Sequence, residues 1–222
     1  MQKSKILNIP YNNQVHTQIT IQSQDPNWQE PFWYLCGPAS INMVLVYFGL
    51  ANTLASTTKI IAENILVDPN NNDGRLTDWM KMVTYLEEEF KITSEFITTT
   101  LTFADIQQKI NAGLPILTSF SFTLPPDEKG ETKLIGHIVT IIGYATPDIV
   151  IINDPFGGKI IPNPVEENTY YHNWTHRNAQ LSHDNSDGYG SQVKYTYSEL
   201  SKILSNMWLS FTNVPNPSNA KA

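Results

Sequence analysis

The only cysteine of the chain, Cys36, stands where an aromatic stretch gives way to a helical pattern, in FWYLCGPASINMVLVYFG at residues 32–49. Gly37 permits close backbone approach of a substrate, and Pro38 suits the first turn of a helix, where its missing N–H has no partner to lose. A helix N-terminus lowers the pKa of a thiol, because unpaired N–H groups and the helix dipole favour the thiolate. Cys36 is therefore a candidate nucleophile.

A cysteine nucleophile needs a general base, and the chain has five histidines. Only His137 begins a strongly apolar strand, GHIVTIIGY, and Gly136 before it leaves space beside the imidazole. Asp154 ends the following strand, and a short hairpin between the two strands brings it towards His137. A carboxylate there would fix the imidazole tautomer and stabilise the imidazolium, so we predict a triad of Cys36, His137 and Asp154.

Acyl transfer also needs hydrogen-bond donors for the oxyanion that develops at the attacked carbonyl group. The backbone N–H of Cys36 can supply one donor. A glutamine amide can supply a second, and Gln14 in the stretch IPYNNQ is the first candidate. The alternative for Gln14 is an exposed polar residue in an N-terminal strand.

The elements that must position these residues follow from the apolar spacing. Positions i, i+3, i+4 and i+7 predict a helix from residue 37 that closes at Gly49. Further helices are predicted at 75–90, at 102–113 between a Thr102 cap and Gly113, and at 198–207.

The second half of the chain carries β-branched runs bounded by Gly, Pro and Asp. They predict strands at 114–122, 137–144, 148–154 and 208–214. Three residues, TPD, separate the middle two strands, which should form an antiparallel hairpin. Helices first and strands later indicate an α+β fold.

Composition bounds the class of protein. The 222 residues are 41% apolar and 16% charged, which predicts a folded chain with a substantial core. No repeat or long linker divides the sequence, so we expect one domain over 1–222. A single cysteine cannot form an internal disulfide.

Charge and hydropathy exclude several partners. The net charge of −7 and the pI near 5.1 argue against nucleic-acid binding, which requires clustered Lys and Arg. No stretch approaches the roughly 20 apolar residues that span a bilayer. The N-terminus MQKSKILNIPYNNQ lacks the apolar core of a signal peptide, so we expect a soluble chain that starts in the cytoplasm. A phage-borne or released protein would look the same.

Four ordered blocks, IPYNNQ, CGPASINMVLVYFG, GHIVTIIGY and IVIINDPFGG, together resemble the papain-like cysteine peptidases of the bacteriocin-leader (double-glycine) processing peptidase-like family. The resemblance implies a papain-like α+β fold, with a helical N-terminal part that carries the nucleophile at a helix N-terminus and packs on a C-terminal antiparallel sheet. It also implies Cys36 as nucleophile, His137 as base, Asp154 as orienting residue and Gln14 as oxyanion donor. We expect a peptide or protein substrate, with cell-wall peptides among the candidates, and no cofactor.

The sequence departs from this family pattern in two places. The separation of 22 residues between Gln14 and Cys36 is long and contains other glutamines, of which Gln29 is the strongest competitor and Gln18, Gln22 and Gln24 are others. The segment 162–192 is rich in Tyr, His and Asn and lacks core periodicity. We interpret it as a family-variable insert that could face the substrate.

Each candidate also has a purely structural interpretation. A lone cysteine is most often a buried small apolar residue, and His137 could be a core histidine. Asp154 before a proline could be only a turn. The aromatic residues near Cys36 are core anchors or the wall of a substrate groove, and Trp33 and Tyr34 are the candidates for that wall.

Metal binding is not favoured. His172 and His176 have the spacing of ligands on one helical face, with His183 and Asp184 nearby, but Asn and Thr between them disfavour a helix. The calcium-loop-like stretches at 68–74 and 184–188 place proline or histidine where the first aspartate belongs, so we interpret both as turns.

The sequence therefore predicts a cysteine peptidase or amide hydrolase that acts through a thioester. Two alternatives stay open: a binding or sequestering module on the same fold, and an acyltransferase that resolves the same thioester with an amine. The substrate and its cleavage site are not written in the sequence.

Overall fold

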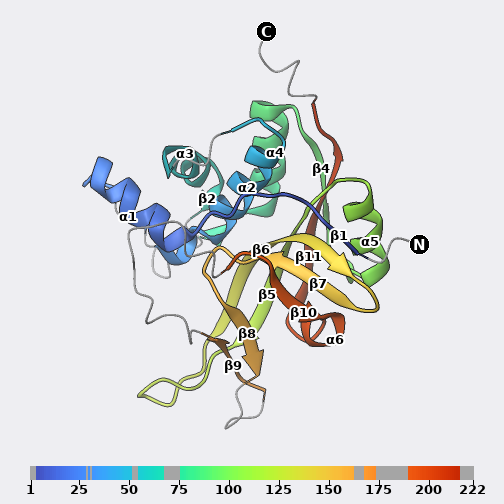
Figure 1. The fold of residues 1–222 in the computed structure, drawn as a ribbon. Helices are drawn as coiled ribbons and strands as arrows, with labels where there is room; N and C mark the ends of the chain where they lie inside the picture. Colours follow the sequence, from blue (N-terminus) through green and yellow to red (C-terminus); the bar gives the residue numbers. More distant parts are fainter. Residues whose placement is uncertain are drawn as a thin grey trace.

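The structure, a computed structural model, describes residues 4–28, 30, 32–51, 55–67, 76–162, 168–173 and 190–215. A group of helices lies against an antiparallel sheet whose strands differ in length (Figure 1). The helical elements are α1 (Gln14–Gln24), the 3₁₀ turn η1 (Phe32–Tyr34), α2 (Cys36–Tyr47), α3 (Ala55–Ile65), α4 (Trp79–Phe90), α5 (Phe103–Asn111) and α6 (Tyr197–Leu200).

The main sheet has the strand order β10-β7-β6-β5-β11-β4, with β1 also paired to β6. Its strands are β1 (Ser4–Ile6), β4 (Thr93–Ile97), β5 (Ile116–Thr123), β6 (Leu134–Ala145), β7 (Ile149–Asn153), β10 (Val193–Thr196) and β11 (Leu204–Asn213). Two short antiparallel pairs stand apart from it, β2 (Leu66–Val67) with β3 (Leu76–Thr77), and β8 (Lys159–Pro162) with β9 (Tyr170–Asn173). The predicted α+β class is confirmed, and β1 and β4 add strands from the N-terminal half.

Strand β6 is the centre of the sheet and changes partners along its length. β5 pairs with its residues 134–141, whereas β7 pairs only with residues 140–145. Within the described part of the chain, residues 134–139 have no strand partner on the side opposite β5. Helix α2 contacts this stretch, since the Ser40 hydroxyl donates to the Ile138 carbonyl oxygen, and the contact brings Cys36 close to β6.

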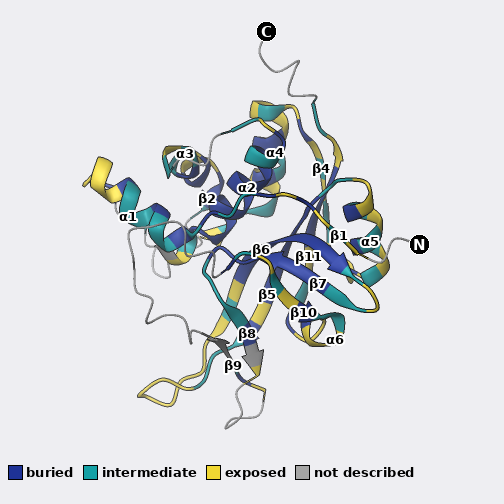
Figure 2. Ribbon diagram, in the orientation of Figure 1, coloured by how far each residue is buried: buried dark blue, intermediate teal, exposed yellow. Residues whose placement is uncertain are grey.

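Successive residues of the central strands contribute to two apolar clusters, as the alternation of a strand requires. Leu117, Ile138 and Leu209 pack with helices α2, α3 and α4, while their neighbours Ile116 and Val139 pack with α5 and α6 in the second cluster. Helix α2 is the most enclosed helix, because every residue from Cys36 to Leu45 is buried. Figure 2 shows it dark along most of its length.

Two predicted helices need correction. The helix predicted at 75–90 starts at Trp79, because the Asp78 side chain accepts hydrogen bonds from the backbone N–H groups of Met80 and Lys81. The helix predicted at 198–207 is the short α6, and the chain enters β11 at Leu204, where pairing with Phe120 of β5 replaces helical hydrogen bonds. Helices α1 and α3 were not predicted.

Candidate active site

Cys36 opens helix α2, with Leu35 as the N-cap residue. Its exposed fraction is 8%. One turn later, the Ser40 hydroxyl donates to the Ile138 carbonyl oxygen at 3.2 Å, and Thr140 Oγ1 donates to the Ser40 carbonyl oxygen at 3.5 Å. These two contacts attach the start of α2 to β6 beside His137.

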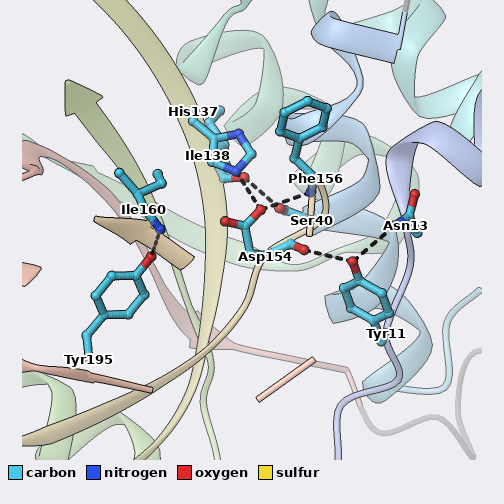
Figure 3. A network of polar contacts seen from close by, with 9 residues as sticks. All are labelled: Tyr11, Asn13, Ser40, His137, Ile138, Asp154, Phe156, Ile160 and Tyr195. Atoms are coloured by element: carbon cyan, nitrogen blue, oxygen red, sulfur yellow. Dashed lines mark hydrogen bonds and ion pairs between the residues drawn. The ribbon is translucent and has the colours of Figure 1, made fainter. Parts of the chain in front are cut away.

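His137 and Asp154 form a buried pair, with 2.7 Å between Nε2 and Oδ1 (Figure 3). Their exposed fractions are 5% and 0%. The same carboxylate oxygen accepts the backbone N–H of Phe156 at 2.9 Å, and the Phe156 ring packs edge-on against the imidazole. Because Nε2 is engaged with Asp154, Nδ1 is the ring nitrogen left for Cys36.

Interactions within this cluster favour the charged forms of both Cys36 and His137. Burial alone would raise the pKa of the Cys36 thiol, but the hydrogen bond and charge of His137, followed by backbone hydrogen bonds from Ile138 and Gly37, lower it overall. Burial likewise opposes the charged form of His137, yet Asp154 and then Cys36 raise its pKa to about 10. A thiolate beside an imidazolium is the protonation state that these shifts favour at neutral pH.

Gln14 is the first residue of α1 and is 2% exposed, so the alternative of an exposed strand residue is wrong. Its backbone N–H donates to the Pro155 carbonyl oxygen at 2.8 Å, next to Asp154. Gln18 is partly buried further along α1, and Gln22 and Gln24 are exposed. Gln29 lies outside the described residues.

A cavity of about 840 Å³ contains Cys36, His137 and Gln14 in its wall. The predicted wall residues Trp33 and Tyr34 line it too, as does Gly136, whereas another aromatic residue that precedes Cys36, Trp28, is buried in a separate apolar cluster. Sequence reasoning did not predict the other lining residues, which are Leu76, Thr77, Trp79, Ser119, Phe122, Leu124, Leu134, Ile135, Ile138, Phe156 and Met207.

Apart from the Cys36 and His137 pair, the cavity wall is mostly apolar. None of its described lining residues is Asp, Glu, Lys or Arg. Several are large apolar side chains left open to solvent, among them Leu134 at 72%, Trp33 at 58% and Leu76 at 57% exposed. Exposed apolar side chains that gather around one cavity indicate a surface that a ligand covers.

The two glycines of the predicted site differ in their surroundings. A Cβ added to Gly37 would collide with the Thr77 side chain, so Thr77, and not a substrate, takes up the space beside this residue. A Cβ added to Gly136 would meet no atom within 4 Å. The space predicted beside His137 is therefore present in the cavity.

The remaining predicted features lie mostly outside the described residues: His176, His183, Asp184 and the stretches 68–74 and 184–188. His172 lies on β9, which is a strand and not a helix. Among described residues, no group of three or more His, Cys, Asp and Glu side chains could hold a metal ion. In the same part of the chain, every helix is too short or too polar to cross a membrane.

A buried cysteine, histidine and carboxylate beside an open cavity are the groups that thiol-dependent hydrolases use. A family profile described as the Peptidase_C39-like family matches residues 6–182. The chain belongs to this family and is a cysteine peptidase.

Among solved structures, the chain is similar to a double-glycine motif protease from an AMS/PCAT transporter in complex with the leader peptide, with a TM-score of 0.48, 12% identity and 93% of each chain covered. It is also similar to xylellain, a cysteine protease from Xylella fastidiosa, with a TM-score of 0.38, 12% identity, and 97% of this chain and 87% of that chain covered. A search of curated proteins finds no match.

Proposed function

We propose that this peptidase cleaves peptide-type amide bonds through a thioester at Cys36, with His137 as acid and base and Asp154 as the orienting carboxylate. The observation that carries the proposal is the 2.7 Å contact between His137 Nε2 and Asp154 Oδ1, buried beside Cys36 at the wall of the cavity. Because Nε2 bonds to Asp154, Nδ1 is the ring nitrogen that can exchange a proton at Cys36. The carboxylate also stabilises the imidazolium.

In the first half of the reaction the Cys36 thiolate attacks the carbonyl carbon, and a C–S bond forms while the carbonyl oxygen becomes an oxyanion. The imidazolium of His137 then gives its proton to the amide nitrogen, the C–N bond breaks and the amine leaves. In the second half, His137 takes a proton from water as the hydroxide attacks the thioester. The C–S bond breaks, which releases the carboxylic acid product and restores the thiolate, and the acid then gives its proton to solvent.

The oxyanion requires donors fixed before the reaction begins. The backbone N–H of Cys36 stands at the start of α2, where a helix has no internal acceptor for it. We assign the second donor to the Gln14 side chain, because Gln14 is buried at the same cavity and its backbone is bonded to Pro155.

The cavity wall favours a peptide with apolar side chains near the cleaved bond. Leu134, Leu76 and Met207 offer apolar surface. No described lining residue is Asp, Glu, Lys or Arg, so away from the Cys36 and His137 pair the wall offers no ion-pair partner to acidic or basic side chains. A substrate side chain that covers this surface gains the free energy of burying apolar area.

The test compares the unmodified chain with Cys36→Ala on a library of proteome-derived peptides and on cell-wall fragments, with products identified by mass spectrometry. We expect new N-termini next to apolar residues with the unmodified chain only. Turnover in Cys36→Ala should fall by about 10⁶, as when an activated nucleophile is removed. Binding of peptides without cleavage by either protein would refute the proposal in favour of a binding module, and products joined to an added amine would indicate acyl transfer.

A further inference from the structure

The chain between β1 and α1 crosses the end of β7, where the orienting carboxylate lies. Three consecutive residues at that end, Asn153, Asp154 and Pro155, are each hydrogen-bonded to the crossing chain. Asn153 Nδ2 donates to the Ile9 carbonyl oxygen at 3.2 Å. The Tyr11 hydroxyl donates to the Asp154 carbonyl oxygen at 2.9 Å, and the Gln14 N–H donates to that of Pro155 at 2.8 Å.

Tyr11 occupies the middle of this crossing, and Figure 3 shows its hydroxyl between Asp154 and Asn13. Besides donating to Asp154, the hydroxyl accepts a hydrogen bond from Asn13 Nδ2 at 3.3 Å. Asn13 is the N-cap of α1, because its Oδ1 accepts the N–H groups of Val15 and His16. One phenol thus connects the peptide group of Asp154 to the cap of the helix that starts with Gln14.

The peptide of Asp154 is enclosed from both sides. Its N–H donates to the Gly190 carbonyl oxygen at 2.7 Å. A Cβ added to Gly190 would collide with both the Asp154 carbonyl oxygen and the Tyr11 hydroxyl, so a side chain at this position would separate them. The close approach therefore depends on glycine, as is typical where backbone segments must nearly touch.

We propose that Tyr11 is a positioning residue of the peptidase, which sets Asp154 and the start of α1 in fixed relation so that the base and the oxyanion donor stay aligned with Cys36. This inference rests on the proposed function. Tyr11 itself touches no reacting atom. Its effect passes through Asp154 to His137, and through Asn13 to Gln14.

The phenol keeps its proton throughout the working pH range. Burial, and next the charge of Asp154, raise the pKa of Tyr11, and the same two causes raise the pKa of Tyr195 on the other side of Asp154. The groups around Asp154 that change charge with pH are therefore Cys36 and His137. A change in their titration reports on how well Asp154 is positioned.

The experiment replaces the hydroxyl alone, in Tyr11→Phe, with Tyr197→Phe as the matched control. The Tyr197 hydroxyl also donates to a backbone carbonyl oxygen, that of Leu101, at 2.8 Å, and Tyr197 does not line the cavity. Iodoacetamide is the probe, because Cys36 is the only cysteine and the mass of the whole protein reports its alkylation. The pKa of the His137 imidazole is followed by NMR in parallel.

At mildly acidic pH we expect Tyr11→Phe to alkylate about fivefold more slowly than the unmodified chain, the equivalent of one lost hydrogen bond. The His137 pKa should fall, while Tyr197→Phe leaves both quantities unchanged. Equal behaviour of the two variants would overturn the role of Tyr11. Slow alkylation of the unmodified chain would overturn the proposed function itself.

If Tyr11→Phe does not fold, Asn13→Ser replaces it. Serine keeps an oxygen for the N-cap of α1 but removes the amide donor to the Tyr11 hydroxyl. A smaller shift in the same direction is expected from this variant. Alkylation and a His137 pKa identical to those of the unmodified chain would count against the proposal.

Discussion

The two sides of the candidate site are built by different kinds of contact. On the helix side, α2 is buried at every residue from Cys36 to Leu45, and apolar packing with α3 and β6, together with two hydrogen bonds at Ser40, places Cys36. On the sheet side, hydrogen bonds place His137 and Asp154, which lie where β6 has lost its pairing with β7. Packing is insensitive to charge but sensitive to volume, whereas hydrogen bonds to a buried carboxylate are sensitive to charge.

This difference suits the two tasks. A nucleophile must keep its place while its bonds change, and a close-packed helix has few alternative positions. A base must gain and lose a proton, so it needs partners that respond to charge. The two sides should therefore fail in different ways when they are mutated.

Gln14 stands where the two sides meet, and among substitutions that keep the nucleophile its replacement should have the largest effect. Gln14→Ala removes the amide donor that we assign to the oxyanion, so kcat should fall by about 10², in the range seen when one oxyanion donor is lost. Cys36 alkylation should change far less, because the thiolate depends on His137. Peptide cleavage and iodoacetamide labelling separate the two effects.

Two further glutamines serve as controls for this prediction. Gln18→Ala lies one turn along the same helix, and Gln29→Ala tests the competitor that the sequence left open. Both should cleave peptides at the rate of the unmodified chain. A large loss in Gln29→Ala, with Gln14→Ala active, would transfer the donor role to Gln29.

The fold could be predicted where local patterns were strong. The β-branched runs at 114–122, 137–144 and 148–154 correspond to β5, β6 and β7, and the capping residue Thr102 starts α5 as expected. The error at Leu204 has a physical reason, since pairing with β5 overrides a local helical pattern. Helix α3 buries Thr58 and Ala62 beside Ile61 and Ile65, and because one of these residues is polar and another small, the stripe gives only a weak helical pattern.

Only the site residues that stand in local sequence motifs could be predicted. Cys36, His137 and Asp154 stand in recognisable local contexts, and the contact of the last two is present in the structure. Leu76, Met207 and Tyr11 could not be predicted, because they meet the site through long-range contacts that no local pattern encodes. The stretch IPYNNQ did contain Tyr11, but nothing in it indicates a contact with Asp154.

Substitutions of Asp154 test the sheet side of the site, where hydrogen bonds to a buried carboxylate place the base. Asp154→Asn keeps an oxygen that can accept from His137 and from the Phe156 N–H, and removes only the charge. Because Asp154 raises the pKa of His137, its loss should lower that pKa, so the alkaline limb of activity moves to lower pH. A less populated imidazolium also raises the pKa of Cys36, so the acid limb moves to higher pH. The active range narrows from both ends.

At neutral pH we expect kcat/KM of Asp154→Asn to fall about tenfold, which corresponds to a change of roughly one unit in a pKa. Asp154→Ala, which also breaks both hydrogen bonds, should lose more. Asp148→Asn removes a charge next to the same hairpin strand, six residues away in the sequence, and should leave the pH profile unchanged. An unshifted profile in Asp154→Asn would mean that the carboxylate charge does not act on His137.

Gly37 lies on the helix side of the site, which is held by packing. Its substitution should have the smallest effect on catalysis and the clearest effect on the free energy of unfolding. In Gly37→Ala the new Cβ meets the Thr77 side chain, so we expect the free energy of unfolding to fall by about 1–3 kcal/mol, as overpacking costs. Gly136→Ala is the matched control, because its Cβ enters open space, and its stability should stay within about 0.5 kcal/mol of the unmodified chain. Urea unfolding measures both.

The cause of that loss can be isolated with a double mutant. Thr77→Ala removes the two outer atoms of the side chain that Gly37→Ala would strike, so the double variant should recover part of the stability lost in Gly37→Ala. A favourable coupling energy between the two substitutions identifies steric conflict, because independent sites would simply add. Additive effects would show that the start of α2 is not fixed by Thr77, and the contrast between a packed nucleophile and a hydrogen-bonded base would then have to rest on the buried face of α2 alone.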